Sequence, residues 1–317
     1  MSIRLLKKQD IIRAGQRIEP FIRVTPVLWN EHIDKDFQRV IRFKCENLQR
    51  TGSFKLRGAL NALSLLRSTG SCKNIATHSS GNHGAAVACA AREFDMDCTV
   101  IMPRTAPDVK QENIRSYAAR IVFCEPTMEA RLTATDDIIA QTGARLVHPF
   151  NDYAIMAGQG TAALELLQTC PDLDAIIVPV GGGGLLSGTA TIAKALNPNI
   201  TIYGVEPEKA NDQQRSFRRR ERVSIADPDT IADGLRTTCP GEKPFATILA
   251  YADNIVTVSE QTIRKAMRLI WDRLKIIVEP SGAVPLAALM ESTTSITGRK
   301  IGIILSGGNL DLESWTW

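Results

Sequence analysis

The chain has 317 residues, of which 44% are hydrophobic and 23% charged, an ordinary composition for a globular protein with one large domain or two medium ones. Its formal net charge is only +4, and much of the excess lies in one arginine-rich run, residues 215–222, so the charge pattern does not favour nucleic-acid binding. The seven cysteines are scattered without CxxC spacing, the first ten residues carry charges where a signal peptide needs an apolar core, and no stretch reaches the length of a membrane span, so we expect a soluble cytoplasmic protein without a disulfide framework or a zinc site.

The first predicted elements lead to one lysine. Residues 9–22 carry apolar side chains at helical spacing, and residues 40–45 alternate as a strand does. The stretch 51–59 follows, with Lys55 at its centre, and a helix is predicted over 59–66. A lysine in such a turn can attack a carbonyl if its surroundings disfavour the ammonium form. On this stretch alone, a solvated structural lysine is the more common interpretation.

Strands and helices then alternate along most of the chain. This alternation predicts an α/β protein with parallel sheets covered by helices, and the absence of repeats or low-complexity linkers puts any domain boundary within continuous α/β structure. The predicted strands are 74–78, 97–102, 120–123, 145–148, 175–180, 201–205 and 300–305, and the predicted helices are 84–94, 109–117, 128–142, 158–168, 185–196, 259–274 and 282–291.

The loop Ser79-Ser80-Gly81-Asn82-His83-Gly84 lies between the first of these strands and its helix. It brings hydroxyls, an amide and backbone N–H groups together, a set that suits a carboxylate. A serine helix cap followed by a turn would explain Ser80 and Gly81 and would leave the density of polar groups unexplained. We interpret His83 as a hydrogen-bonding wall residue and not as a catalytic base.

Four consecutive glycines, Gly181, Gly182, Gly183 and Gly184, connect an apolar strand to a helix. They let backbone N–H groups converge on an anion at a helix N-terminus, which predicts a phosphate site. The run lacks the GxGxxG spacing of a dinucleotide fold and the GK[ST] ending of a P-loop. A tight turn would account for one or two glycines and not for four.

Two further loops follow strands. Glu206 and Asp212 flank the Ala210 carbonyl, and oxygen ligands of this kind suit Mg²⁺ or Ca²⁺, although an acidic loop without metal is the commoner occurrence. Near the end of the chain, an apolar strand leads into Ser306-Gly307-Gly308-Asn309. Ligands of open α/β sheets gather at such strand ends.

A lysine, a phosphate cradle, a carboxylate loop and a strand-end hydroxyl are together the groups that hold pyridoxal phosphate as a Schiff base for work on an amino acid. The motifs GSFKLRGA, SSGNHG, GGGG and SGGN, in this order and at these intervals, resemble those of the fold type II pyridoxal phosphate enzymes. Within them the chain is similar to the group of serine racemases, serine/threonine dehydratases and 3-hydroxyaspartate dehydratases. The resemblance covers nearly the whole chain.

The resemblance implies a role for each motif. Lys55 would bind the cofactor covalently and act as the base on one face of the substrate. Ser306 would face the pyridine nitrogen, where a hydroxyl, unlike a carboxylate, does not enforce ring protonation and so allows a β-leaving group to depart readily. The implied cofactor-binding residues are Phe54, Lys55, Asn82, Gly181, Gly182, Gly183, Gly184 and Ser306, and the implied substrate-binding residues are Ser79, Ser80, Asn82 and His83.

Ser80 distinguishes the possible activities. In serine racemases the serine at this position faces the lysine across the substrate and can return a proton to Cα from the opposite side, so the resemblance implies Lys55 and Ser80 as the two catalytic residues. The alternative is that Ser80 only binds substrate or caps the helix, because 3-hydroxyaspartate dehydratases also have this serine.

Other implications concern ligands and departures from the racemase pattern. The resemblance implies a divalent cation (Mg²⁺, Ca²⁺ or Mn²⁺) at Glu206, the Ala210 carbonyl and Asp212. Ala85 replaces a glutamine that helps animal serine racemases bind ATP, although Lys275 and Asn309 resemble other members of that site, so nucleotide activation is in doubt. Phe150 and the stretch 206–217 look more like the dehydratases.

We therefore predict a two-domain fold type II enzyme similar to the tryptophan synthase β chain. Residues 1–73 and 152–317 would form a large cofactor-binding domain, and residues 74–151 a small domain that grips the substrate. The predicted activity is racemisation of serine with elimination of water to pyruvate and ammonia, and the resemblance implies a homodimer. The alternatives are a threonine, serine or 3-hydroxyaspartate ammonia-lyase with little racemisation, and a non-catalytic metabolite-binding protein of the same fold.

Overall fold

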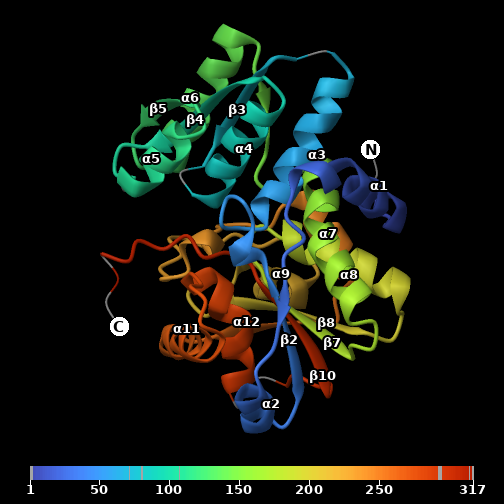
Figure 1. Cartoon of the computed structure of the whole chain (residues 1–317). Coiled ribbons are helices and arrows are strands. Elements are labelled where there is room, and N and C mark those ends of the chain that lie inside the picture. Colours follow the sequence, from blue (N-terminus) through green and yellow to red (C-terminus); the bar gives the residue numbers. More distant parts are fainter. Residues whose placement is uncertain are drawn as a thin grey trace.

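The structure is a computed structural model that describes residues 3–70, 72–79, 81–106, 108–291, 295–313 and 315. Within these residues it contains a large mixed sheet and a smaller parallel sheet, each flanked by helices (Figure 1). Helices lie on both sides of the large sheet. The strands β3, β4 and β5 and the helices α4, α5 and α6 form the other end of the molecule, at the top of Figure 1. The α/β class predicted from the alternating pattern is confirmed.

The last described strand of the chain, β10, lies near the centre of the large sheet. β10 pairs in parallel with β2 on one side and with β7 on the other, from Lys300 beside Val40 to Leu305 beside Cys45. Only the two-residue β1 runs antiparallel, against β2. In spatial order the strands are β1 (Val27–Leu28), β2 (Val40–Cys45), β10 (Lys300–Leu305), β7 (Ala175–Pro179), β8 (Thr201–Pro207) and β9 (Asn254–Val258).

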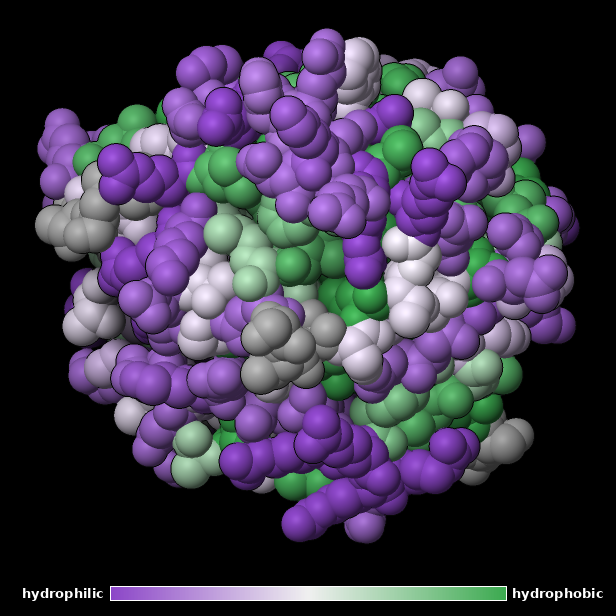
Figure 2. Space-filling model, turned by 90° about the horizontal axis from the view of Figure 1, so that it is seen from below, coloured by the Kyte–Doolittle hydropathy of each residue, from purple (hydrophilic) through white to green (hydrophobic). Residues whose placement is uncertain are grey.

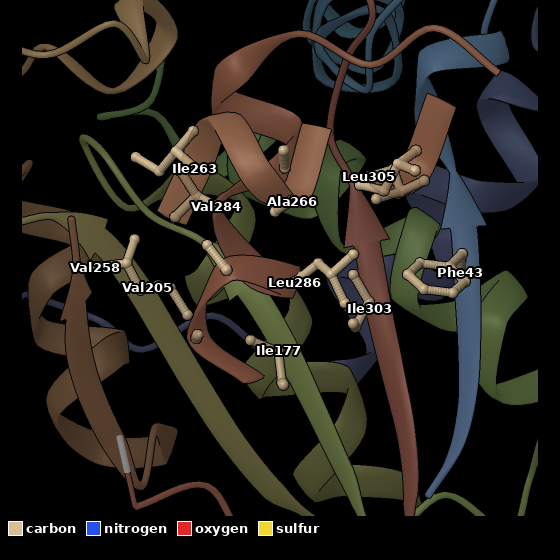
Figure 3. Close-up of a cluster of buried hydrophobic side chains, with 14 of the residues drawn as sticks. Phe43, Ile177, Val205, Val258, Ile263, Ala266, Val284, Leu286, Ile303 and Leu305 are labelled. Atoms are coloured by element: carbon tan, nitrogen blue, oxygen red, sulfur yellow. The ribbon is translucent and has the colours of Figure 1, made fainter. Parts of the chain in front are cut away.

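Alternate residues of these strands enter two separate cores, because successive side chains of a strand point to opposite faces. Ile177 and Ile303 pack with the helices on one face, α11 and α12, and Figure 3 shows them beside Val284 and Leu286. Ile176 and Ile304 pack against the helices of the other face, which include α1, α7 and α8. These helices are α1 (Lys8–Ile18), α7 (Tyr153–Thr169), α8 (Gly184–Leu196), α11 (Glu260–Leu274) and α12 (Pro280–Met290).

The small sheet is wholly parallel and has the order β5-β4-β3-β6. Its alanine-rich helix α4 is buried almost throughout and contacts α3, which leads back to the large part. The elements are β3 (Asn74–His78), β4 (Asp97–Pro103), β5 (Arg120–Cys124), β6 (Arg145–Leu146), α3 (Lys55–Ser68), α4 (Asn82–Glu93), α5 (Asp108–Arg115) and α6 (Met128–Thr142).

The predicted strands and helices are all present, with shifted ends. The helix α7 begins at Tyr153 and not at residue 158, and α3 begins at Lys55 itself and not at residue 59, so the lysine occupies the first turn of its helix. The prediction omitted three helices, the two edge strands of the large sheet and the short 3₁₀ turns. The omitted elements are α2 (Glu31–Phe37), α9 (Asp212–Arg219), α10 (Glu242–Tyr251), β1, β9 and the short 3₁₀ turns Glu19–Phe21, Glu46–Leu48 and Asp233–Leu235.

A buried network of charges fixes the start of α3. Arg57 is fully buried, and its guanidinium donates to Glu46 at 2.7 and 2.9 Å and to Glu165 at 2.7 and 2.8 Å. Lys44 also donates to Glu165, at 2.5 Å, and Arg57 donates to the Thr161 hydroxyl at 3.2 Å. Two cations and two carboxylates therefore neutralise each other inside the protein, two residues along the chain from Lys55.

Hydrophilic side chains predominate on the face of the molecule shown in Figure 2, and smaller groups of hydrophobic ones lie between them. The arginines of α9 are exposed, as expected of a solvated helix face. No helix among the described residues is both long and apolar enough to cross a membrane.

Candidate active site

Lys55 lies at the carboxyl end of the large sheet, in the first turn of α3. Its Nζ donates to the Pro149 carbonyl at 3.1 Å and lies 5.2 Å from the centre of the Phe54 ring. The turn before it is hydrogen-bonded to the serine-bearing loop: the Phe54 N–H donates to the Ser306 carbonyl at 3.0 Å, and Ser53 bridges to Gly307. The turn that carries Lys55 and the loop that carries Ser306 are thus neighbours in the structure, as the sequence predicts.

The surroundings of Lys55 disfavour its ammonium form. Burial lowers the pKa of the Lys55 amine from its ordinary 10.5 to about 8, and the nearby Glu279 carboxylate opposes the shift only in part. A larger fraction of the amine is therefore neutral near neutral pH than for a solvated lysine, and the neutral amine is the form that attacks a carbonyl.

This shift predicts the pH dependence of covalent cofactor attachment. Because the folded-state pKa is about 8, the attachment rate of pyridoxal 5'-phosphate to apoprotein should rise as pH increases through about 8 and level off above it. Absorbance of the protein-bound chromophore, followed from pH 6 to pH 10, measures this rate, and circular dichroism over the same range checks that the protein stays folded. A midpoint near 10 would show that the amine is solvated.

The middle two glycines of the four-glycine loop have no room for side chains, and the outer two are tightly packed. A Cβ on Gly182 would lie 2.3 Å from the Phe150 ring, and Gly183, the N-cap residue of α8, has a φ of +94° in the left-handed region. The Gly182 and Gly183 carbonyls accept bonds from Gly241 and Ser187 N–H groups, at 3.2 and 2.9 Å. The first N–H groups of a helix have no intrahelical acceptor, so this buried helix start fits a phosphate.

The segment 148–150 joins this loop to the lysine. Pro149 accepts the Lys55 hydrogen bond, while the next side chain, Phe150, covers the glycines. His148 lies edge-on to the Phe150 ring at 4.7 Å between ring centres, and its Nδ1 accepts the Asn151 N–H at 2.9 Å. Burial lowers the pKa of His148 to about 4, so this ring is neutral near neutral pH.

Asn82 is held between two polar side chains from distant parts of the chain. Its Nδ2 donates to Glu279 Oε1 at 2.8 Å, and its Oδ1 accepts a bond from Asn309 Nδ2 at 2.7 Å. A Cβ on Gly307 would lie 2.4 Å from Glu279 and 3.2 Å from the Asn82 amide, so this trio adjoins Ser306. One N–H of the Asn82 amide is left for a ligand.

Glu279 is the functional candidate that the sequence analysis missed. It is buried immediately before α12, and burial raises the pKa of its carboxyl to about 8, with the Asp233 carboxylate acting in the same direction. In the sequence, Glu279 could have been recognised as a single acidic residue that follows the apolar run 276–278 and directly precedes a proline at a helix start.

Two of the predicted substrate-binding residues, Ser79 and His83, lie at the two ends of the polar loop after β3. Ser79 lies half-buried at the start of the loop, and its Oγ accepts the Gly81 N–H at 3.4 Å. His83 is buried, and its Nε2 lies 3.1 Å from the Val147 carbonyl; burial, with the Lys55 charge, holds the pKa of His83 well below its ordinary value. Ser80 lies outside the described residues.

Glu206 and Asp212 lie at the end of β8 and the start of α9, and Ala210 is buried between them in the chain. Glu206 accepts the N–H groups of Gln213 and Gln214 at 3.0 and 2.7 Å. Burial raises the pKa of Glu206 well above its ordinary range and that of Asp212 to about 7. Within the described residues, neither carboxylate forms an ion pair with a lysine or arginine.

A hard divalent cation would relieve this buried negative charge, and two carboxylates with a backbone carbonyl suit its preference for oxygen. Such a set contains only two acidic side chains, and the part of the chain that the structure describes holds no cluster of three or more histidine, cysteine, aspartate or glutamate side chains arranged for a metal.

Known proteins resemble the chain over almost its full length. The family model described as "Pyridoxal-phosphate dependent enzyme" matches residues 18–307. The chain is 47% identical to serine racemase of Dictyostelium discoideum, with 96% of this chain and 95% of that protein covered. It is 40% identical to β-hydroxyaspartate dehydratase of Paracoccus denitrificans, with 98% of each covered. The crystal structure of the Dictyostelium discoideum serine racemase superimposes with a TM-score of 0.91 at 46% identity, over 97% of this chain and 99% of that one.

Proposed function

The chain belongs to the family of pyridoxal-phosphate dependent enzymes, and on that premise we propose that it is a serine racemase that also eliminates water from serine to give pyruvate and ammonia. The observation that carries the proposal is the amine of Lys55, with its pKa lowered to about 8, held beside a buried glycine loop and the Asn82–Glu279 pair. The similarity to serine racemases supports the choice of substrate.

The residues of the site fit pyridoxal phosphate. Lys55 would hold it covalently, with Phe54 beside it; Asn82 would donate to its ring hydroxyl, and Ser306 would face its ring nitrogen. Gly181, Gly182, Gly183 and Gly184 would bind its phosphate through backbone N–H groups. When bound, the cofactor supplies an electron sink for negative charge at the substrate Cα.

The protein groups would do the proton chemistry. The Lys55 amine would take the Cα proton on one face, because a neutral amine with a pKa of about 8 is a competent base near neutral pH. Ser79, Asn82 and His83 would orient the substrate carboxylate. The Ser80 hydroxyl, on the opposite face, would return a proton to Cα, which inverts the centre; departure of the β-hydroxyl instead leads to the keto acid.

A second candidate is a 3-hydroxyaspartate or threonine ammonia-lyase with little racemisation. The Phe150 ring that covers the glycine loop favours it, since an aromatic residue at this position resembles the dehydratases, and a β-hydroxyaspartate dehydratase is among the similar proteins. Serine, threonine and 3-hydroxyaspartate assayed side by side, with D-serine counted against keto acid, distinguish the two activities.

Replacing Ser80 by alanine should separate the two reactions. We expect serine racemisation to fall about 10²- to 10⁴-fold, as for loss of a positioned proton donor, while elimination stays within about tenfold. Chiral chromatography and keto-acid release measure both. Ser116→Ala, an exposed serine of the small part, is the matched control and should change neither. Equal loss of both reactions in Ser80→Ala would mean that Ser80 is not a dedicated second base.

We also propose a divalent cation, Mg²⁺, Ca²⁺ or Mn²⁺, bound by Glu206, the Ala210 carbonyl and Asp212. The two buried carboxylates without a basic partner among the described residues support it. A homodimer in the cytoplasm is proposed on the family resemblance, and the scattered free cysteines fit a reducing compartment. The division into a domain of residues 1–73 with 152–317 and a domain of residues 74–151 stays a prediction.

A further inference from the structure

Gln213 has a buried amide that the described protein groups leave unsatisfied. The residue is 0% exposed, and neither its Oε1 nor its Nε2 has a hydrogen-bond partner. A buried polar group without a partner costs about 1–3 kcal/mol, and such groups in native proteins are usually satisfied by an ordered water or an ion. An amide with both atoms unpaired therefore points to a ligand beside it.

The position of Gln213 connects two parts of the proposed site. Its backbone N–H donates to Glu206 Oε1 at 3.0 Å. Its Nε2 lies 2.7 Å from the point that a Cβ on Gly183 would occupy, and Ile248 and Pro244 of α10 close the apolar side of the same point, at 2.8 and 2.9 Å. The amide thus lies between the acidic loop and the glycine that begins α8.

Thr237 makes a second connection of the same kind. Its hydroxyl donates to the two oxygens of Asp212 at 3.1 and 3.2 Å. Its methyl group lies 3.5 Å from the point that a Cβ on Gly181 would occupy. Glu206 is therefore linked to Gly183 through Gln213, and Asp212 is linked to Gly181 through Thr237.

The chemistry of the unpaired amide fits a hard cation. Mg²⁺ and Ca²⁺ take carboxylate, backbone carbonyl and Asn or Gln carbonyl oxygens. The side chain of Gln213 carries one such oxygen, which is buried and has no hydrogen-bond partner, and the backbone of the same residue already contacts the Glu206 carboxylate.

We propose that Gln213 belongs to the cation site and couples it to the phosphate loop. The Oε1 atom of Gln213 is a ligand of the cation, and this contact fixes the orientation of the amide. The oriented amide in turn holds Gly183 in place, at the start of the helix that binds the phosphate. Cation and cofactor then each raise the affinity for the other, and by linkage the two factors are equal. The inference rests on the proposed function, because it requires pyridoxal phosphate at the glycine loop and a cation at Glu206 and Asp212.

The test measures binding and not turnover. Apoprotein is titrated with pyridoxal 5'-phosphate, followed by tryptophan fluorescence, in chelator and in saturating Mg²⁺, and Mg²⁺ is titrated calorimetrically into apoprotein and holoprotein. We expect Mg²⁺ to tighten cofactor binding about 5- to 150-fold in the wild type, and the cofactor to tighten Mg²⁺ binding by the same factor.

Two variants of Gln213 and one neighbour make the test specific. Gln213→Met keeps the length and removes the amide, so the coupling factor should fall to about one. Gln213→Glu keeps an oxygen and adds a negative charge, so it should bind Mg²⁺ more tightly than the wild type. Gln214→Met is the matched control, because Gln214 also donates its N–H to Glu206 but its side chain donates to the Ile255 carbonyl at 3.1 Å, away from the loop; its coupling should stay at the wild-type value.

The failures are distinguishable. Wild-type protein that does not bind pyridoxal 5'-phosphate at all would overturn the proposed function. Cofactor binding that is the same in chelator and in Mg²⁺ would overturn the inference alone, as would full coupling in Gln213→Met. If Gln213→Met does not fold, a Gln213→Glu variant that folds and binds Mg²⁺ no more tightly than the wild type would contradict the role of the Gln213 oxygen.

Discussion

Replacing Lys55 by alanine is expected to lower both racemisation and elimination at least about 10³-fold, because the substitution removes the covalent anchor and the base at once. The glycine loop does not depend on this side chain, so pyridoxal 5'-phosphate should still bind without covalent attachment. Visible absorbance of the holoprotein before and after borohydride reduction measures the attachment, and chiral product analysis measures the two reactions.

Lys265→Ala is the matched control, since Lys265 is an exposed lysine of α11, and the variant should keep both the covalent chromophore and the activity. A Lys55→Ala protein that still attached cofactor irreversibly after borohydride treatment would show that another amine is the anchor. Wild-type holoprotein with bound cofactor and no turnover of any of the three substrates would instead favour the metabolite-binding alternative.

Replacing Arg57 by methionine should lower the free energy of unfolding by about 3–5 kcal/mol, since removing one member of a buried ion network leaves uncompensated charge. Here the Glu46 carboxylate would lose its bidentate partner inside the core, and Glu165 would keep only Lys44. A loss of this size is a large share of the 5–15 kcal/mol that typically stabilises a domain. Urea unfolding of apoprotein, followed by circular dichroism, measures it through the midpoint at constant slope.

Arg4→Met is the comparison for this experiment. Arg4 forms an ion pair with Asp10 at 2.8 Å, but its side chain is 49% exposed, and such surface pairs contribute about 0–1 kcal/mol. If the two variants lost similar stability, the buried network would not be holding the start of α3. Because α3 begins at Lys55, we also expect Arg57→Met to weaken covalent cofactor attachment, whereas Arg4→Met should leave it unchanged.

The parts of the site that could be predicted from the sequence are those with a local signal. The glycine run 181–184 follows an apolar strand and precedes a helix, and the lysine turn 51–55 stands in the same relation to β2 and α3. In both places the residues that specify the backbone conformation are neighbours in the chain. The four motifs are also sufficient to identify the family, and the family match over residues 18–307 confirms that identification.

The parts that could not be predicted depend on contacts between distant residues. Asn82 and Glu279 are 197 positions apart, and nothing near either of them indicates the other. Gln213 is a polar residue in an arginine-rich segment, and only its burial against Gly183 distinguishes it. Helix α9 was omitted because its buried residues, Asp212, Gln213, Gln214 and Ser216, are polar and give no apolar periodicity.

The place of β10 in the large sheet has a consequence for how the protein is made. β10 lies between β2 and β7, and the loop that follows it is hydrogen-bonded to the turn before Lys55. This central strand is therefore synthesised after all the other strands of the sheet. Until residues 300–307 have emerged, β2 and β7 have no common partner, and the turn before Lys55 lacks its backbone contacts to Ser306 and Gly307. Cofactor loading must therefore follow translation, and a chain that is released early has an incomplete sheet and no site to load.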